Sequence, residues 1–376
     1  MGEIKIKEKK IKIIYFIPCI AIGGAEGQLQ LLIKKLNKKK YDITLCTIKS
    51  NDEFFLKGIR GTAKILELNI NRISDFFNIK KMVKLFKIYK ELKEINFHII
   101  QGYLFYGKIF AFFLKLLSSN SVFISAERNT GYWRKRYHII IENILNRYID
   151  LYIVISNAVK KALIKQLNIN FNKVKVVYNG IDEKKFYVNK NKRSKDRKIA
   201  IIGRFHPVKG HKFFFHLAKE LINEYDDKLK FLVVGEGDYE ENIISCSKEL
   251  NVYNNTSFIK GKTDLLDIYN EIKLLLICSY SEGFSNVAAE AMMCGVPIVA
   301  FSVGSLIEVI SSGETGYLVE FGNIKEMKEK VIILLEDDIT YNKMSQNAIK
   351  KAKLKFTLNR LVYETEQIYE NICKDK

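Results

Sequence analysis

The chain has 376 residues, of which 48% are hydrophobic and 28% are charged. This length predicts two domains, and the low content of Gly (21) and Pro (3) argues against a disordered chain. Residues 1–10 lack the apolar run of a secretory signal, which predicts a cytoplasmic protein. The most apolar stretch, 104–117, contains Lys108 and Lys115 and is shorter than the roughly 20 residues that cross a bilayer, so no membrane span is expected.

The net charge of +20 is unevenly distributed along the chain. Residues 1–180 contain 33 Lys and Arg against 13 Asp and Glu, whereas residues 181–376 contain 29 of each kind. A basic first half favours contact with an anionic partner, such as a membrane surface, a lipid-linked phosphate or a nucleic acid. The alternative is a lysine-rich composition that only solvates helices.

Cysteine and histidine patterns do not predict a metal site. The cysteines are Cys19, Cys46, Cys246, Cys278, Cys294 and Cys373, with no Cys-x-x-Cys pair and no zinc-like spacing. The histidines are His98, His138, His206, His211 and His216, which are also not spaced as ligands. We therefore expect free thiols in a reducing compartment and no bound metal.

In the first half, short apolar and β-branched runs alternate with longer amphipathic stretches. This alternation is typical of strands and helices around a mostly parallel sheet. The predicted strands are 11–17, 43–48, 64–68, 98–103, 122–125, 152–155 and 174–178. Helices are predicted in the gaps, for example over 80–95 and over 156–167, where Ser156 is placed to cap the first turn.

A second α/β series begins at Lys198. Its predicted strands are 199–203, 231–235, 257–259, 274–278, 297–301 and 316–319, followed by helix from residue 336 to the end. The polar run before this series reads as a linker. The predicted organisation is an N-terminal domain (1–180), a linker (181–197), a second domain (198–355) and a C-terminal helix (356–376) that could pack back on the first domain. Two Rossmann-like domains facing a central cleft are the expected α/β fold.

The run from Ser281 to Ala300 carries the strongest chemical signal. It follows a predicted buried strand, turns at Gly283, starts a helix near Asn286 and ends that helix at Gly295. Backbone N–H groups at such a helix start suit an anionic diphosphate. Glu282 in the loop and Glu290 in the helix offer carboxylate oxygens that can accept hydrogen bonds from sugar hydroxyls.

This run resembles the donor-site signature of the retaining family 4 glycosyltransferases, which have a two-domain B-type fold. The resemblance implies that Glu282 lies near the donor sugar and Glu290 near the ribose of the nucleotide. It also implies that Phe284, Ser285 and Asn286 contribute to substrate binding. By the same resemblance, residues 198–355 bind the nucleotide sugar and residues 1–180 form the acceptor side.

A second match lies between Ile202 and Gly210. In the family, the arginine and lysine of this motif grip the donor diphosphate, which implies that role for Arg204 and Lys209. Fixed cations stabilise the charge that develops on a leaving diphosphate. Because the sequence contains no Asp-x-Asp, we predict a metal-independent reaction with no cofactor beyond the nucleotide-sugar substrate.

Weaker matches extend the resemblance to the loops that follow other strands. Gly23 and Gly24 occupy a small-residue loop that lets a ligand approach the backbone. Gly235 and Ile259 lie where the family holds the base. The chain departs from the family in the first domain, where histidines are often found, and Arg128 in the run Arg-Asn-Thr-Gly-Tyr-Trp is the residue expected to reach the substrate.

The sequence thus predicts a retaining transferase that moves a sugar from a nucleotide diphosphate donor to a hydroxyl of a lipid-linked or oligosaccharide acceptor in surface-polysaccharide synthesis. The alternatives are a sugar-nucleotide 2-epimerase of the same fold and a non-catalytic nucleotide-sugar-binding protein. Basic stretches with aromatics, 80–93 and 133–136, predict peripheral contact with an anionic membrane at its inner face, through Phe86, Tyr89, Trp133 and Tyr137. The alternative is a solvated helix face. No nucleic-acid recognition module accompanies them, so nucleic acid is not an expected partner.

Overall fold

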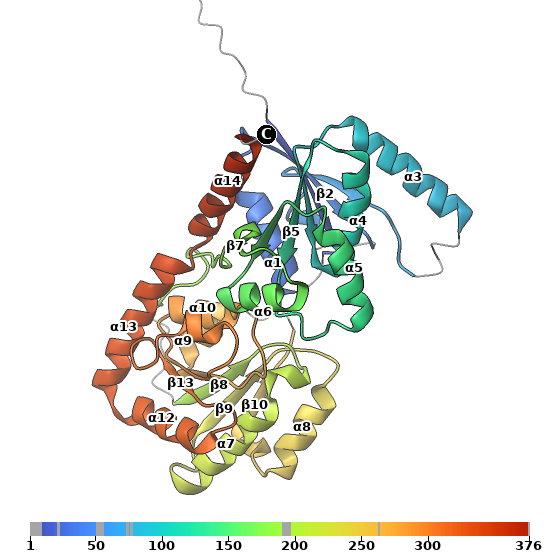
Figure 1. Cartoon of the computed structure of the whole chain (residues 1–376). Coiled ribbons are helices and arrows are strands. Elements are labelled where there is room, and N and C mark those ends of the chain that lie inside the picture. Colours follow the sequence, from blue (N-terminus) through green and yellow to red (C-terminus); the bar gives the residue numbers. More distant parts are fainter. Residues whose placement is uncertain are drawn as a thin grey trace, which may run out of the picture. The chain divides into compact units, whose positions relative to one another are not determined.

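The computed structural model describes residues 10–20, 23–49, 56–72, 75, 78–189, 197–261 and 264–374. The chain forms two compact units (Figure 1). Unit 1 contains Met1–Gly180 together with Leu358–Lys376, and unit 2 contains Ile181–Thr357. Residues 1–9, and residues 190–196 of the predicted linker, lie outside the described residues.

Unit 1 is built on a parallel sheet of seven strands in the order β3-β2-β1-β4-β5-β6-β7. The strands are β1 (Ile11–Ile17), β2 (Tyr41–Thr47), β3 (Lys64–Glu67), β4 (Ile99–Tyr103), β5 (Val122–Glu127), β6 (Leu151–Val154) and β7 (Val174–Val176). The central strands are buried almost throughout, as expected of a parallel sheet with helices on both faces. The chain runs from β1 to β2 on one side and returns to β4 on the other, which creates a topological switch point between β1 and β4.

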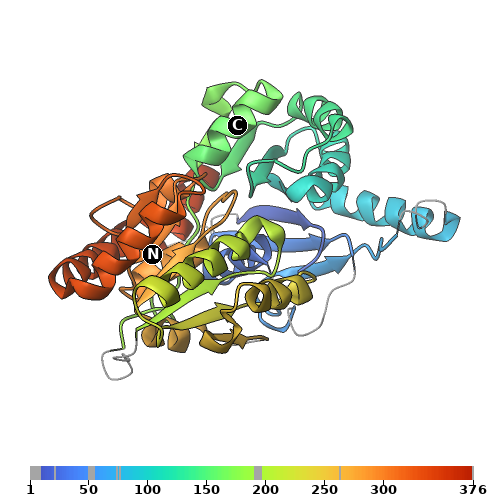
Figure 2. The same cartoon turned by 90° about the horizontal axis from the view of Figure 1, so that it is seen from below.

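The helices of unit 1 are α1 (Gly24–Lys35), α3 (Ile79–Glu94), α4 (Leu104–Leu117), α5 (Arg136–Asn146), α6 (Asn157–Leu167) and α14 (Leu358–Lys374). The predicted cap of α6 is confirmed, because Ser156 Oγ accepts a hydrogen bond from Val159 N at 3.1 Å. The helix ends at Asn168, which takes a left-handed conformation (φ 48°). In both views α3 extends away from the other elements of unit 1 (Figure 1, Figure 2).

The last helix, α14, closes the core of unit 1. Tyr369 is fully buried, its hydroxyl lies 3.1 Å from that of Tyr15 in β1, and it donates a hydrogen bond to Gln101 Oε1 in β4 at 2.5 Å. Leu358 and Leu361 join the same hydrophobic cluster as the strands. A segment more than 250 residues from β4 along the chain therefore completes the first core.

Unit 2 is a parallel sheet of six strands in the order β10-β9-β8-β11-β12-β13. The strands are β8 (Lys198–Ile202), β9 (Lys230–Val234), β10 (Thr256–Ile259), β11 (Leu274–Ile277), β12 (Ile298–Phe301) and β13 (Tyr317–Val319). The helices are α7 (His211–Glu224), α8 (Glu240–Glu249), α9 (Leu265–Glu271), α10 (Asn286–Met293), α11 (Leu306–Val309), α12 (Ile324–Glu336) and α13 (Asp338–Lys355). The sheet and helices enclose a second core rich in phenylalanine.

The start of the predicted linker packs within unit 2. Phe186 is buried, and its ring lies 5.9 Å from that of Tyr269 in α9. The backbone N–H of Asn189 donates to Asn270 Oδ1 at 3.0 Å. Residues up to Asn189 are therefore part of the unit that the second series of strands builds.

The predicted α/β architecture of two parallel sheets is confirmed, and each predicted strand agrees with an observed one to within a few residues. All six cysteines are free thiols. Among the described residues, no helix combines the length and apolar character needed to cross a membrane.

Candidate functional site

The loops that follow β8 and β9 interlock at the carboxyl edge of the sheet in unit 2. Gly235 has φ 153°, and a Cβ at this position would lie 2.0 Å from the carbonyl oxygen of Gly203. Only glycine fits such an approach. The N–H of Gly235 donates to Ile259 O at 3.0 Å, and that of Phe205 donates to Glu236 O at 2.9 Å. The backbone of the predicted phosphate loop and that of the predicted base-binding loops therefore form one surface.

Lys209 and Glu282 are brought into direct contact. The Lys209 ammonium lies 2.7 Å from Glu282 Oε1, which also accepts a hydrogen bond from Ser279 Oγ at 2.7 Å. Glu282 is buried, whereas the Lys209 side chain retains 25% of its exposure. Together with Ser285 they line a small pocket between the ends of β8 and β11. Two residues 73 positions apart thus share one charged site.

Arg204 lies on the same loop as Lys209, at the end of β8. Its side chain is exposed, and no carboxylate pairs with it within the described part of unit 2. The loop therefore offers one cation that is already paired and one that is open to solvent.

The turn into α10 forms as the sequence predicts. Ser285 is the N-cap, and its Oγ accepts a hydrogen bond from Ala288 N at 3.2 Å. Phe284 is buried with its ring 5.5 Å from that of Phe356, so its side chain serves the core and only its backbone can face a ligand. Asn286, the first residue of α10, is half-buried.

Glu290 lies one turn further along α10. Its Oε2 accepts a hydrogen bond from the hydroxyl of Tyr269 at 2.9 Å. Burial raises the pKa of Glu290 to about 7, although the Tyr269 hydrogen bond and the charge of Lys185 oppose this. The carboxyl group therefore changes its protonation state near neutral pH, unlike an ordinary surface glutamate.

In unit 1, the predicted small-residue loop leads into α1. Gly23 is the N-cap without a side-chain hydrogen bond, Gly24 is the first helical residue, and the Glu26 carboxylate lies over Gly23. Arg128 follows β5, and its Nη1 donates to Asn179 Oδ1 at 3.1 Å. The structure gives no direct contact between the Gly23 loop and Arg128.

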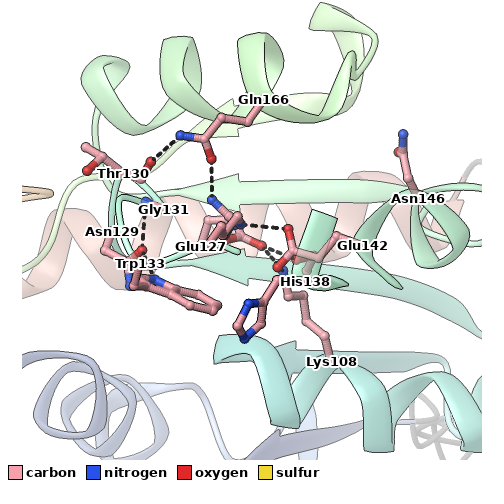
Figure 3. Close-up of polar contacts among 12 residues, drawn as sticks. Lys108, Glu127, Asn129, Thr130, Gly131, Trp133, His138, Glu142, Asn146 and Gln166 are labelled. Carbon is pink, nitrogen blue, oxygen red and sulfur yellow. Dashed lines mark hydrogen bonds and ion pairs between the residues drawn. The ribbon is translucent and has the colours of Figure 1, made fainter. Parts of the chain in front are cut away.

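Beneath Arg128 lies a buried cluster of four charges, which we name the ionic quartet: Lys108, Glu127, Arg134 and Glu142. Lys108 Nζ lies 2.5 Å from Glu127 Oε1 and 2.7 Å from Glu142 Oε1. Arg134 lies 2.8 Å from Glu127 Oε2 and 2.9 Å from Glu142 Oε2. Each side chain is at most 6% exposed, and Figure 3 shows Lys108, Glu127 and Glu142 converging from α4, β5 and α5.

The alternating signs in the ionic quartet compensate the burial of its members. Burial raises the pKa of a carboxyl, but Lys108 and Arg134 outweigh it and hold the pKa of Glu127 below its ordinary value. Ser125 Oγ adds a hydrogen bond to Glu127 Oε1 at 2.9 Å. Each of the four groups is therefore paired with two partners of opposite sign.

Sequence reasoning missed this cluster, although one signal was present. Lys108 interrupts the most apolar stretch of the chain, and a lysine in such a place needs a buried partner. Its partners lie 19 and 34 residues away, so their identity follows only from the fold. The described residues contain no group of three or more His, Cys, Asp or Glu side chains that could hold a metal ion.

Two family models match the chain and together span most of it. Residues 22–185 match the model described as Glycosyltransferase Family 4, and residues 182–351 match that described as Glycosyl transferases group 1. The boundary between the two matches lies close to the boundary between the two units.

Curated relatives carry related names. The chain is 30% identical to the N-acetyl-alpha-D-glucosaminyl L-malate synthase of Bacillus anthracis over 54% of its own length and 55% of that protein. It is 28% identical to the capsular polysaccharide biosynthesis glycosyltransferase CapM of Staphylococcus aureus over 59% and 62%. An uncharacterized 41.2 kDa protein from the cps region of Klebsiella pneumoniae is 30% identical over 81% and 85%. The chain thus spans less than two thirds of the first two of these relatives.

Solved structures show the same fold. The Anabaena protein HepE, solved in complex with UDP and glucose, superposes with a TM-score of 0.81 at 18% identity, covering 96% of this chain and 100% of that one. The chain therefore has the B-type glycosyltransferase fold.

Proposed function

Because the chain belongs to the group 1 and family 4 glycosyltransferases, we propose that it moves a sugar, with retention, from a nucleoside diphosphate to a hydroxyl of a lipid-linked glycan in surface-polysaccharide synthesis. The observation that carries this proposal is the single charged site at the carboxyl edge of unit 2, where Lys209 meets Glu282. The capsular function named for the Staphylococcus aureus relative supports the pathway.

The two cations of the loop that follows β8, Arg204 and Lys209, are assigned to the leaving diphosphate. As the bond between the sugar carbon and the diphosphate oxygen breaks, Arg204 and Lys209 stabilise the negative charge on that oxygen. The acceptor oxygen attacks from the same face, and its proton passes to the leaving phosphate. A bound diphosphate competes with Glu282 for Lys209, which leaves the carboxylate to accept hydrogen bonds from the sugar hydroxyls.

Glu290 is assigned to the ribose of the donor. A carboxylate can accept hydrogen bonds from both ribose hydroxyls, and the Tyr269 hydrogen bond holds one of its oxygens in place. The UDP in the HepE structure makes uridine nucleotides the first donors to examine.

A thermal-shift screen with a panel of nucleotide sugars tests the donor assignment. A donor present at about 100 times its Kd adds about 2.7 kcal/mol to the folded state. We expect a selective increase in melting temperature that Lys209→Met and Arg204→Gln abolish. Absence of any stabilisation would contradict the proposal, and conversion of the selected donor without an acceptor would point instead to an epimerase.

Peripheral binding to an anionic membrane at the inner face of the cell membrane is the second part of this proposal. The 33 basic residues among residues 1–180 give unit 1 its charge, and α3 adds an exposed apolar stripe. Ile79, Val83 and Phe86, at helical spacing, are 79%, 64% and 72% exposed. Exposed apolar side chains flanked by lysines suit the headgroup boundary of anionic lipids.

The structure corrects the residues predicted for this contact. Tyr89 is buried and donates a hydrogen bond to Phe110 O at 2.7 Å. Trp133 packs against Phe105 and His138 and donates to Asn129 Oδ1, so neither aromatic is free to enter a bilayer. Phe86 and Tyr137 are exposed, as predicted.

Cosedimentation of the full chain with vesicles tests the membrane contact. We expect binding to anionic but not to zwitterionic vesicles, weakened by salt because the Debye length at physiological ionic strength is about 8 Å. The double variant Val83→Ser/Phe86→Ser should lose binding, whereas Ile339→Ser in unit 2, which is 84% exposed, serves as the matched control. Equal binding to both lipids would contradict the proposal.

A further inference from the structure

The loop between β5 and α5 is held rigidly by its own side chains. Gly131 N and Trp133 Nε1 both donate to Asn129 Oδ1, at 2.9 and 2.8 Å. Gly131 has φ 74°, and a Cβ there would lie 1.7 Å from Arg134 Nη1, so the guanidinium of Arg134 closes directly over the turn.

The ionic quartet anchors this loop to the rest of unit 1. Arg134 Nη1 donates to Gln166 Oε1 in α6 at 2.9 Å, and Gln166 Nε2 donates to the carbonyl of Thr130 at 2.9 Å (Figure 3). The two remaining sides of Arg134 bind Glu127 and Glu142. Because Glu127 immediately precedes Arg128, the same contacts hold the backbone from which the Arg128 side chain extends.

Arg128 differs from its basic neighbours in the quartet because its charge is not neutralised. Its guanidinium lies 5.1 Å from the centre of the Tyr103 ring and donates to Asn179. Its Nε is buried without a hydrogen-bond partner, and within the described part of unit 1 no carboxylate pairs with it. A half-buried guanidinium with an unused donor is costly unless an anion completes it.

The position of Arg128 is that of a ligand site in this type of sheet. Tyr103 ends β4, which adjoins β1 at the topological switch point, and ligands bind outside the carboxyl ends of the strands there. The next residue, Leu104, has φ 59°, a left-handed conformation that is uncommon for leucine. Such backbone outliers concentrate at functional sites.

We propose that Arg128 binds an anionic group, phosphate or carboxylate, of the acceptor, and that the ionic quartet positions it for this purpose. This inference rests on the proposed function and names the chemistry of its second substrate. Arg128 is the binding residue. Glu127 and Arg134 are positioning residues, because they act through the loop and not on the ligand.

The chain contains a single tryptophan, Trp133, which lies in the same loop and reports on it directly. We would titrate the full chain with geranyl diphosphate, inorganic pyrophosphate, L-malate and uncharged geraniol while following Trp133 fluorescence. L-malate tests a carboxylate source, and the diphosphates test a phosphate source. We expect a saturable change with one anionic probe and none with geraniol.

Four variants locate the response. Arg128→Gln should weaken probe binding about 10- to 100-fold, the loss typical of a hydrogen-bonded charge. Arg136→Gln removes one exposed positive charge from the same region and should change little. Arg204→Gln, in the donor loop of unit 2, should leave the response intact. Arg128→Lys keeps the positive charge but lacks the planar guanidinium, and it should bind the probe with intermediate affinity. This variant also tests the inference if Arg128→Gln fails to fold.

Any of three results would overturn the inference. The first is a response lost in Arg204→Gln and kept in Arg128→Gln, which would place the anion in the donor loop. The second is equal weakening by Arg136→Gln, which would indicate a diffuse basic surface, and the third is no saturable response to any probe. Probe binding is measured without a donor and without turnover, whereas the proposed function is tested separately by the nucleotide-sugar screen. Failure of this inference can therefore be distinguished from failure of the proposed function.

Discussion

The two units handle charge at their carboxyl edges in different ways. In unit 1 the ionic quartet buries two cations and two anions, each bound on both sides. In unit 2 one pair, Lys209 and Glu282, meets at 2.7 Å with the lysine partly exposed. A closed network holds backbone in place, whereas a single half-exposed pair can open and exchange one partner for a ligand. We therefore propose that the first arrangement positions the loop and that the second takes part in the chemistry.

Breaking the ionic quartet should have the largest effect on stability. Glu142→Gln leaves two buried cations to share one carboxylate, and loss of one partner of a buried ion pair costs about 3–5 kcal/mol. Urea unfolding followed by Trp133 fluorescence reports on unit 1, since this is the only tryptophan. The double variant Lys108→Met/Glu142→Leu removes one charge of each sign and should cost less than the single variant.

The corresponding change in unit 2 supplies the contrast in stability. Lys209→Met removes a partly exposed cation from the buried Glu282, which keeps its hydrogen bond from Ser279, and should lower the free energy of unfolding by less than Glu142→Gln does. A cost equal to that of Glu142→Gln would show that the two charge arrangements do not differ in the way we infer.

Turnover, in contrast to stability, should be lowered most by changes in unit 2. Arg204→Ala or Lys209→Ala should lower the rate by about 10² to 10³, the loss typical of one fixed group that stabilises developing charge. The assay is product formation with the donor selected by the thermal-shift screen. Near-wild-type rates in both variants would remove the diphosphate assignment.

Glu290 gives unit 2 a pH dependence that sharpens the comparison. Burial raises its pKa from 4.5 to about 7, so the folded state retains a proton that the unfolded chain releases. The free energy of unfolding should therefore fall as pH rises from about 5 to about 7, by on the order of 2 kcal/mol. Glu290→Gln should flatten this slope in urea titrations followed by circular dichroism. An unchanged slope would mean that Glu290 is ionised throughout.

Chelation should have the smallest effect. If Arg204 and Lys209 alone stabilise the leaving diphosphate, product formation should survive EDTA. Loss of activity that added magnesium restores would reveal a metal requirement and transfer part of the role of these cations to the ion.

Much of the fold could be predicted because its signals are local. Apolar runs, the Ser156 cap and the turn at Gly295 identify strands and helix ends from neighbours only a few residues away. The roles of Arg204, Lys209 and Glu282 could be proposed in advance because their motifs resemble those of the family. Each of these residues follows a strand, and the carboxyl ends of parallel strands lie at one edge.

Predictions about side-chain exposure were less successful. Tyr89 and Phe86 both lie on α3, yet one is buried and the other exposed, because the packing of α4 selects the face. Trp133 belongs to a basic, aromatic run that reads as a membrane contact, but its hydrogen bond to Asn129 turns it into the loop.

By itself, then, the sequence determined the order of strands and helices, since this order depends on spacing along the chain. The phosphate loop and the donor glutamates are roles that the resemblance of its motifs implies. Only the tertiary structure decided that Lys108 would meet Glu127 and Glu142, that no carboxylate in the described part of unit 1 would pair with Arg128, and that burial would raise the pKa of Glu290 to about 7. Each of these outcomes depends on which charges and apolar surfaces come together across tens of residues. Coulomb interactions and desolvation are set by distance in space, so no pattern along the chain contains them.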